Sequence, residues 1–285
     1  MSAKCGFLAM KYKPNTIILA INRKKIYTVT LGGLNPSWRN VLKKFIYRMI
    51  RKVVSWVMPV YKVEGIDNLP EGPAVVVGNH SQAFGPLAAE LYFPGTHYTW
   101  CISEMMEKEK VADYAYGDFW SKKPKLIRPF FRLFSYIIPP LAEIVFTNAD
   151  TIPVYRDKRV MKTFQISCDK LEDNAKVVIF PEDYTEHNNI VHEFQRGFVH
   201  VAKYYYRTTG KTVPFVPMYV CPELKKLVFG KPILYSPELP GGQEADRICT
   251  YLQDAISEIA YDMPRHRVVP YPNVSKKNYP YNERM

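Results

Sequence analysis

From residue 74 onward, short apolar segments of strand length alternate with longer segments whose apolar residues follow a helical period. We predict strands over residues 74–78, 98–102, 151–156, 176–180, 212–220 and 227–234, and helices over residues 86–92, 122–138, 158–173, 194–208 and 244–262. This alternation is typical of an α/β fold with a mostly parallel central sheet flanked by helices. Reactive side chains in such folds gather just beyond the carboxyl ends of the strands. The residues that follow 74–78, 151–156 and 176–180 are therefore the first candidates for a functional site.

The segment that precedes this domain has a different pattern. Residues 15–32 alternate apolar and polar side chains around a basic turn, which predicts a β-hairpin. Asn35 and Pro36 then provide a helix N-cap and a first-turn proline, and Pro59 closes the segment. The helix between them is amphipathic, and the charged residues on its polar side are all cations: Arg39, Lys43, Lys44, Arg48, Arg51 and Lys52. Its apolar stripe either packs against the domain or lies in an anionic membrane surface, and the sequence leaves both open.

These patterns divide the chain into four parts: a hairpin extension (1–33), the amphipathic basic helix (34–60), the α/β domain (61–263) and a C-terminal segment (264–285). The C-terminal segment is rich in proline, tyrosine and basic residues and shows no periodicity. We expect it to be an extended tail that either wraps the domain or lies free.

Composition limits the class of partner and the cellular compartment. The net charge of +12 suits an anionic partner, although a solvated basic surface is the plainer explanation. We expect no nucleic-acid partner, because no nucleic-acid-binding module is recognisable. The five cysteines are scattered, which argues against disulfides or a zinc site and favours a reducing cytoplasm: Cys5, Cys101, Cys168, Cys221 and Cys249. No signal peptide is apparent, and no apolar run reaches the ~18 residues of a membrane span. If the protein meets a membrane, we expect it to lie peripherally on the inner face.

Chemistry-bearing residues follow three of the predicted strands. Asn79 and His80 come directly after the strand 74–78, at a strand-to-helix turn where an imidazole can face a cleft. The strand 151–156 ends in Arg156, and the strand 176–180 runs into Phe180-Pro181-Glu182. Two further blocks follow along the chain: Phe194-Gln195-Arg196-Gly197-Phe198 and Val213-Pro214-Phe215-Val216-Pro217.

Taken in order from about residue 68 to 233, these blocks resemble the motifs of the glycerolipid acyltransferase family, which includes lysophosphatidic acid acyltransferases. The resemblance implies transfer of a fatty acyl group from coenzyme A or acyl carrier protein to a hydroxyl of a lysophospholipid or related lipid precursor. It implies that His80 is the general base and that Asn79 and Gly197 belong to the substrate site. It also implies that Arg156 holds an anionic group of the acceptor. No cofactor beyond the acyl carrier and no metal is expected.

The sequence departs from the family pattern at two positions. Gly85 occupies the position of the motif aspartate, which in the family holds the histidine in the tautomer that accepts a proton. Losing such an orienting carboxylate costs ~10⁴ in rate in the serine-protease triad. Thr185 replaces the arginine that contacts phosphate in the family. We hypothesise that Asp183 or Glu182 orients His80 instead; the alternative for Asp183 is that it caps a turn.

Three further alternatives stay open at this stage. His187 and His192 could ligate a metal, but their spacing and the lack of a third ligand favour a polar loop over the site. The apolar segment 125–146 either packs in the core or lines an acyl channel or lipid surface, and Pro139-Pro140 breaks any spanning helix. Finally, Gly85 and Thr185 also fit a catalytically degenerate relative that only binds acyl chains or lipids.

Overall fold

The computed structural model describes residues 16–22, 25–30, 36–107 and 138–284. The chain forms two compact units, one comprising residues 1–49 and 104–148 and the other residues 50–103 and 149–285.

The first unit contains a hairpin and two helices. Strand β1 (Thr16–Asn22) pairs antiparallel with β2 (Lys25–Thr30), as the alternation predicts. Helix α1 (Pro36–Val57) begins at its first-turn proline, and α5 (Ile138–Asn148) carries Pro139 and Pro140 in its first turn, where proline is favoured. The two prolines thus start a helix; most of the helix predicted over 122–138 lies outside the described residues. Ile144 of α5 is buried against Leu42, Ile46 and Tyr47 of α1.

The second unit is built on an eight-stranded sheet, which confirms the predicted fold class. Its strands are β3 (Lys62–Glu64), β4 (Ala74–Gly78), β5 (His97–Ile102), β6 (Thr151–Val154), β7 (Lys176–Ile179), β10 (Pro214–Cys221), β11 (Lys226–Phe229) and β12 (Ile233–Leu234). The order is β3-β11-β10-β4-β7-β5-β6, with β12 paired to β10. The five strands β10, β4, β7, β5 and β6 are mutually parallel, so their carboxyl ends share one edge. β11 and β12 both pair antiparallel with β10, and β3 pairs parallel with β11, so β3 also runs opposite to the five central strands.

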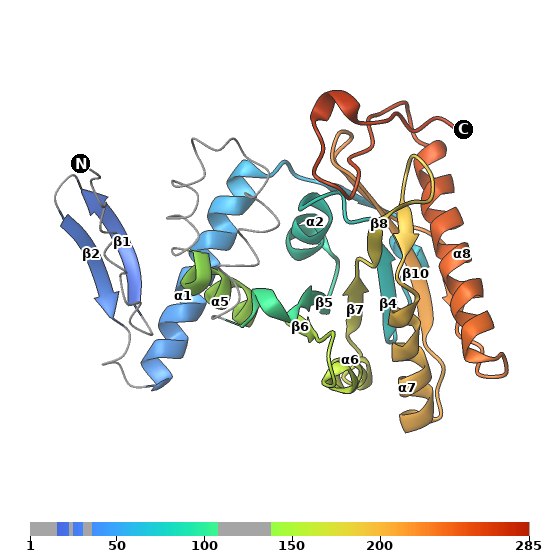
Figure 1. Ribbon diagram of the computed structural model, residues 1–285, viewed down its shortest axis with the longest axis horizontal. Helices are drawn as coiled ribbons and strands as arrows, with labels where there is room; N and C mark the ends of the chain where they lie inside the picture. The colour runs from blue at the N-terminus through green and yellow to red at the C-terminus, as the bar shows by residue number, and fades with distance from the viewer. Residues whose placement is uncertain (1–15, 23–24, 31–35, 108–137, 285) are drawn as a thin grey trace, which may run out of the picture. The chain divides into compact units, whose positions relative to one another are not determined.

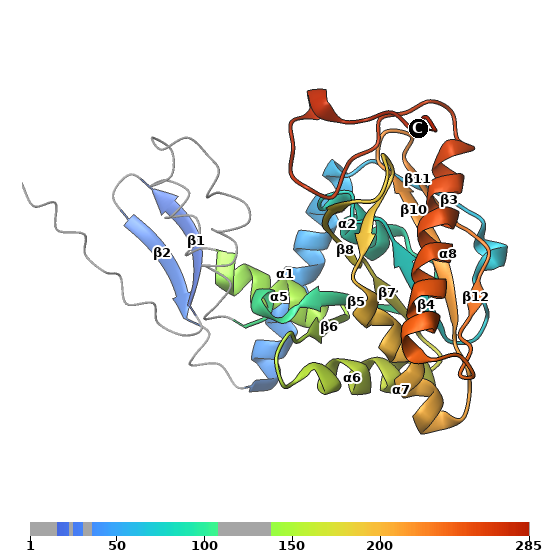
Figure 2. The same ribbon diagram turned by 45° about the vertical axis from the view of Figure 1, so that its right-hand side comes forward.

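Helices cover both faces of this sheet (Figures 1 and 2). One face packs against α6 (Val160–Glu172), α7 (His200–Thr209) and α8 (Gly241–Tyr261), and the other against α2 (Phe84–Tyr92). The alternation along β4 shows why: Val75 and Val77 enter the first core, whereas Ala74 and Val76 enter the second. A fully buried strand therefore reads as a continuous apolar run in the sequence.

Two elements over the carboxyl edge were not predicted as ordered structure. Residues 186–193, expected as a polar loop, belong to an antiparallel hairpin of β8 (Glu182–Glu186) and β9 (His192–Phe194), and Phe194, predicted to begin a helix, ends β9 instead. The C-terminal segment was expected either to wrap the domain or to lie free, and it wraps the domain. It crosses above β8 and α2 in both views (Figures 1 and 2). Four single-turn 3-10 helices complete the described chain: Ile66–Asn68, Ser103–Met105, Arg196–Val199 and Lys276–Asn278. No helix in the described ranges is long and apolar enough to span a membrane.

Candidate active site

His80 lies where the central strand β4 ends, at the shared carboxyl edge of the parallel strands. The turn that follows is unusual, because Ser81 and Gln82 both have left-handed backbone conformations, with φ of 45° and 56°. Non-glycine residues rarely adopt this region, so two in succession mark a constrained turn. The turn brings the Gln82 carbonyl back toward the His80 ring.

The imidazole of His80 donates a hydrogen bond from Nδ1 to the backbone carbonyl of Gln82. A carbonyl oxygen can only accept, so the proton of the neutral ring must be on Nδ1 and Nε2 must carry the lone pair. Burial lowers the pKa of His80 below its ordinary value of 6.5, which keeps the ring neutral at pH 7. The rings of Phe180 and Tyr271 meet the imidazole at angles of 67° and 70°, with centroids 5.6 and 5.3 Å away. His80 is thus held as an acceptor at Nε2, the form a general base requires.

Gly85 explains how this turn differs from the aspartate motif. It is buried in the first turn of α2, and its N–H donates to the His80 carbonyl at 3.0 Å. A Cβ at this position would lie 2.6 Å from the backbone oxygens of both Asn79 and His80. No side chain fits there while the turn keeps its shape. The backbone carbonyl of Gln82 accepts the hydrogen bond from His80 Nδ1, which is what the family resemblance leads us to expect of the aspartate.

Glu182 holds the main chain of His80, and not its ring. It is buried at the start of β8, where one carboxyl oxygen accepts from the His80 N–H and the other accepts from the His192 N–H at 2.9 Å. Burial raises the pKa of this carboxyl to about 7, although the two backbone hydrogen bonds act in the opposite direction. Glu182 therefore fastens the β8–β9 hairpin to the His80 turn, and its orienting effect on His80 passes through the backbone.

Asp183 does not contribute to orienting the imidazole in the way we hypothesised. Side chains alternate along a strand, so Asp183 points away from the direction of Glu182. Its Oδ1 accepts from the backbone N–H of Thr185 at 2.7 Å, which is the turn-capping alternative. Within the described chain no hydrogen bond joins Asp183 to His80. Thr185 itself is exposed.

Asn79 is a structural partner of β10. Its side chain is buried, accepts from the Val220 N–H at 2.7 Å and donates to the Val220 carbonyl at 3.1 Å. It also donates to the Ser81 hydroxyl at 2.7 Å. The amide therefore extends the β4–β10 pairing beyond the last backbone partner and fixes the start of the turn, where the sequence pattern predicts a substrate contact.

No recorded contact joins Arg156 or Gly197 to the His80 turn within the described residues. Arg156 is exposed just after β6 at the same edge of the sheet, three strand positions from β4, which is roughly 14 Å at the usual strand spacing. Gly197 is exposed in the 3-10 turn before α7, and a Cβ there would meet nothing within 4 Å. The structure thus brings His80, Glu182, Asn79 and Gly85 together but leaves Arg156 and Gly197 apart from them.

The two histidines of the β8–β9 hairpin have separate environments. Nδ1 of His187 lies 2.9 Å from Glu193 on the exposed side of the hairpin. His192 is buried, its ring approaches Tyr271 with centroids 6.1 Å apart, and burial lowers its pKa. No group of three or more potential metal ligands occurs among the described residues.

Comparison with known proteins assigns the part of the chain that contains most of these blocks. A family model described as Acyltransferase matches residues 132–221. Within this range the chain is similar to the acyltransferase family. The match spans β6, Arg156, Phe180-Pro181-Glu182 and all of β10; Asn79 and His80 lie before it.

One solved structure similar to this chain is the 1-acyl-sn-glycerophosphate (LPA) acyltransferase PlsC from Thermotoga maritima. It is 15% identical, with a TM-score of 0.46, and the alignment covers 81% of this chain and 85% of that chain. No curated protein matches the chain significantly.

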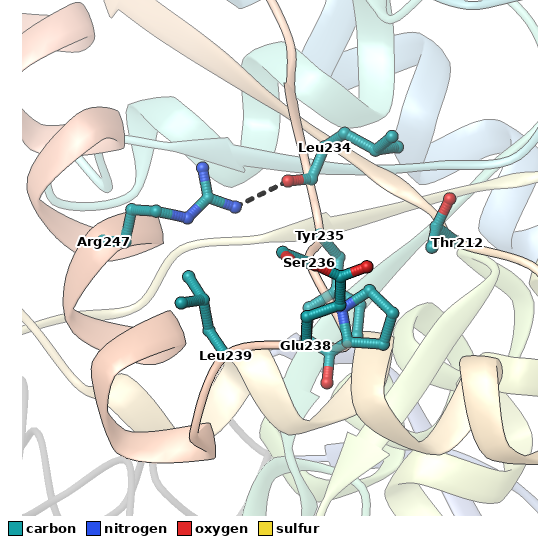
Figure 3. A pocket seen from close by; sticks show the side chains of 8 residues that line it. Thr212, Leu234, Tyr235, Ser236, Glu238, Leu239 and Arg247 are labelled. Atoms are coloured by element: carbon teal, nitrogen blue, oxygen red, sulfur yellow. Dashed lines mark hydrogen bonds between the residues drawn. The ribbon is translucent and has the colours of Figure 1, made fainter.

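A cavity of about 550 Å³ lies at the opposite edge of the eight-stranded sheet, where β12 pairs with the start of β10 (Figure 3). Figure 3 shows Arg247 donating to the Leu234 carbonyl, at 2.7 Å. Arg247 also pairs with the buried Glu244 at 2.7 Å. Because this cation is already bound within the fold and the cavity is remote from His80, we do not place the reaction there.

Sequence reasoning missed the residues that complete the His80 environment: Gln82, Tyr271 and Tyr279. Gln82 acts through its backbone carbonyl, which no side-chain motif reports. The two tyrosines are about 190 residues away in a segment without periodicity. The abundance of tyrosine and proline in that segment was the only signal, and it did not indicate where the segment packs.

Proposed function

We propose that this acyltransferase-family protein transfers a fatty acyl group from a thioester of coenzyme A or acyl carrier protein to a hydroxyl of a lysophospholipid or a related lipid precursor. His80 is the general base of this proposal. The observation that carries it is the hydrogen bond from His80 Nδ1 to the Gln82 carbonyl, which leaves Nε2 as a proton acceptor.

The proposed reaction needs one base and no covalent enzyme intermediate. The acceptor hydroxyl oxygen attacks the thioester carbonyl carbon while its proton passes to Nε2 of His80. The tetrahedral intermediate then collapses, the C–S bond breaks, and the thiolate leaves and takes up the proton from the imidazolium. Positioned general-base catalysis contributes typically 10²–10⁴ in rate. The acyl carrier is the only co-substrate that this scheme requires.

Arg156 is the proposed site for an anionic group of the acceptor. It is an exposed guanidinium at the same edge as His80, and guanidinium binds phosphate or carboxylate in bidentate fashion. The separation of roughly 14 Å between the two strands favours an acceptor whose anionic group and reacting hydroxyl are several bonds apart.

Helix α1 supports the proposal that the protein works at an anionic membrane surface. Its Leu42, Ile46 and Tyr47 pack around Ile144, so part of the apolar stripe is satisfied within the fold. A second apolar row is exposed, with Trp38 67% and Trp56 74% accessible; the others in this row are Val41, Phe45, Met49, Val53 and Val57. Exposed cations flank this row: Lys44, Arg48 and Lys52.

An exposed apolar row flanked by cations is the arrangement of an interfacial helix, and each nearby Lys or Arg adds about 1 kcal/mol of attraction to anionic lipid. We expect the double variant Phe45→Ser/Met49→Ser to lose co-sedimentation with phosphatidylserine-containing vesicles. Val228→Ala in β11 is a matched control that keeps α1 intact. Equal binding by both variants would remove α1 from the membrane contact.

The decisive experiment for the activity uses purified full-length protein, labelled acyl thioesters and a panel of lysophospholipid, glycerol-phosphate and sugar acceptors. We expect transfer by the wild type and a loss of at least 10² in His80→Ala, whose folding is checked by thermal unfolding. His187→Ala serves as the control, because that ring lies on the exposed side of the β8–β9 hairpin. Transfer that survives in His80→Ala would exclude the proposed base.

The alternative is a degenerate relative that binds acyl chains or lipids without transfer. Thr185, in place of the expected arginine, is the observation that favours it. The Gln82 carbonyl counts against it, because the tautomer of His80 is fixed without the missing aspartate. Lipid binding without transfer on any acceptor in the panel would support this alternative.

A further inference from the structure

The C-terminal segment is fastened to the acyltransferase domain at its base by hydrogen bonds that do not involve His80. Asn282 is buried, accepts from the His266 N–H at 2.7 Å and donates to the Ala260 carbonyl at 2.7 Å. The buried His266 donates from Nδ1 to the Pro264 carbonyl, so its Nε2 accepts from the Tyr219 hydroxyl of β10, both at 2.8 Å. The segment therefore leaves and returns at a fixed point, and the loop 269–280 projects from that point.

The projecting loop reaches the turn that holds His80. The side-chain amide of Gln82 donates to the Tyr279 hydroxyl at 3.1 Å and to the Pro272 carbonyl at 3.4 Å. The backbone carbonyl of the same Gln82 accepts from Nδ1 of His80. Gln82 thus links the loop to the imidazole. Its side chain is bound by the loop, and its main-chain carbonyl accepts the Nδ1 proton of His80.

The loop also contacts the imidazole ring of His80 directly, through Tyr271. The Tyr271 ring meets His80 on edge and contacts the rings of two residues of the β8–β9 hairpin, Tyr184 at 5.1 Å and His192 at 6.1 Å between centroids. Tyr271 therefore closes the space between the catalytic turn and the hairpin. A segment that merely covered the surface would not contact both of these elements and the ring itself.

We propose that residues 269–280 are a built-in part of the active site, in which Tyr279 and Pro272 position Gln82, and Tyr271 positions the ring, so that His80 presents Nε2 to the substrate. All of them act through Gln82 or His80 and are positioning residues. The inference deepens the proposed function, because it names what replaces the motif aspartate: a main-chain carbonyl whose placement depends on the C-terminal loop.

The histidine tautomer is the readout, because it does not depend on any substrate. ¹⁵N-edited NMR of full-length protein distinguishes protonation at Nδ1 from protonation at Nε2, and His80→Gln assigns the signal among the six histidines. We expect wild-type His80 to be protonated at Nδ1. Tyr279→Phe removes one acceptor of the Gln82 amide, and the loss of an ordinary hydrogen bond should raise the ratio of the Nε2-protonated to the Nδ1-protonated form about two- to tenfold. Tyr271→Ala should raise it as well.

Tyr281→Phe is the matched control. Tyr281 lies in the same segment, but its hydroxyl faces Arg267 and its ring stacks on Arg265, with no contact to Gln82. We expect its His80 tautomer to equal that of the wild type. Gln82→Ala keeps the backbone carbonyl and removes the amide, so it should reproduce Tyr279→Phe, and the double variant should add little to either. If Tyr279→Phe does not fold, Gln82→Ala carries the same test.

Kinetics form a second, separate arm. Tyr279→Phe should lower kcat about two- to tenfold with the KM of the acceptor unchanged, because the loop acts on the base and not on binding. An unchanged His80 tautomer in folded Tyr279→Phe and Gln82→Ala would overturn the proposal. A changed tautomer in a protein that transfers no acyl group would leave the positioning role intact and overturn the proposed function alone.

Discussion

Replacing Gly85 tests whether the turn around His80 depends on a glycine at the position of the motif aspartate. The perturbation is Gly85→Ala, with Gly85→Asp as the variant that restores the family residue. The added Cβ would lie 2.6 Å from the carbonyl oxygens of Asn79 and His80, about 0.8 Å inside the 3.4 Å at which ordinary contact begins. Both neighbours are backbone atoms of the catalytic turn, so neither can move by a change of rotamer.

The magnitude follows from the cost of overpacking a buried site, which is about 1–3 kcal/mol. For a chain of this length that corresponds to a fall in Tm of roughly 2–10 °C. The expected loss of transfer is larger than the loss of stability, because a turn that opens to admit a Cβ moves the Gln82 carbonyl away from His80 Nδ1. Gly85→Asp should therefore be at least as impaired as Gly85→Ala, even though it restores the motif.

Thermal unfolding by circular dichroism and the acyl-transfer assay measure the two effects. Gly242→Ala at the start of α8 is the control, because a Cβ at Gly242 meets nothing within 4 Å and should leave both quantities unchanged. A Gly85→Asp protein with wild-type Tm and increased transfer would refute the reasoning. It would mean that the turn adapts to the carboxylate and that the Gln82 carbonyl is dispensable.

Three further predictions concern the titrating groups around this turn. Glu182→Gln places an amide donor against one of two backbone N–H donors, so unfolding free energy should fall by about 1–3 kcal/mol, as measured by urea denaturation. The pKa of Glu182 rises from 4.5 to about 7 on folding. The contribution of Glu182 to stability is therefore fully present below pH 4.5 and is lost as the pH rises through about 7. This loss amounts to roughly 3 kcal/mol of unfolding free energy, and it should be absent in Glu182→Gln. Asp183→Asn should keep the acceptor oxygen for the Thr185 N–H, so its acyl-transfer rate should stay within about twofold of the wild-type rate. A loss of rate beyond tenfold in the same assay would show that Asp183 takes part in catalysis. The acid limb of the pH–rate profile should lie below pH 6.5, because burial lowers the pKa of His80 and the base must be neutral; a limb above pH 6.5 in kcat/KM would contradict this.

The parts of the fold that the sequence predicts well are those in which side-chain period and burial agree. Strand β4 is a continuous apolar run whose residues are buried on both faces, and its predicted bounds coincide with the observed ones. Helices α6 and α8 bury one face of a regular helical period and lie within about three residues of their predicted ends. In these elements local preference and tertiary packing favour the same structure.

In the elements that the sequence did not predict, side-chain period and burial do not agree in this way. Strand β3 is three residues long and two of them are charged, so its period cannot be read. The β8–β9 hairpin is polar over most of its length and is held by the buried Glu182, whose partners come from His80 and His192. Its order depends on hydrogen bonds between distant parts of the chain, which the local pattern does not contain.

The candidate site also has features that the sequence predicts and features that it does not. His80 and Glu182 could be found because they end apolar strands in a parallel sheet, where the carboxyl ends gather. The left-handed backbone at Ser81 and Gln82 could not, because neither is glycine and no residue type at either position signals that conformation. The hypothesis for Asp183 assumed that another carboxylate replaces the missing one, and its role in transfer stays a prediction for the Asp183→Asn assay.

The loss of the motif aspartate and the left-handed turn are connected through Gly85. Orienting a neutral imidazole requires only an acceptor for the Nδ1 proton, and a backbone carbonyl meets that requirement as a carboxylate does. A carbonyl of the turn can reach Nδ1 only if the chain doubles back immediately after His80, which Ser81 and Gln82 achieve with positive φ. Doubling back brings the start of α2 against the Asn79 and His80 carbonyls, where only glycine fits. A neutral carbonyl stabilises the imidazolium less than a carboxylate does, so the same arrangement should give a weaker but functional base, and its rate should respond to whatever holds Gln82 in place.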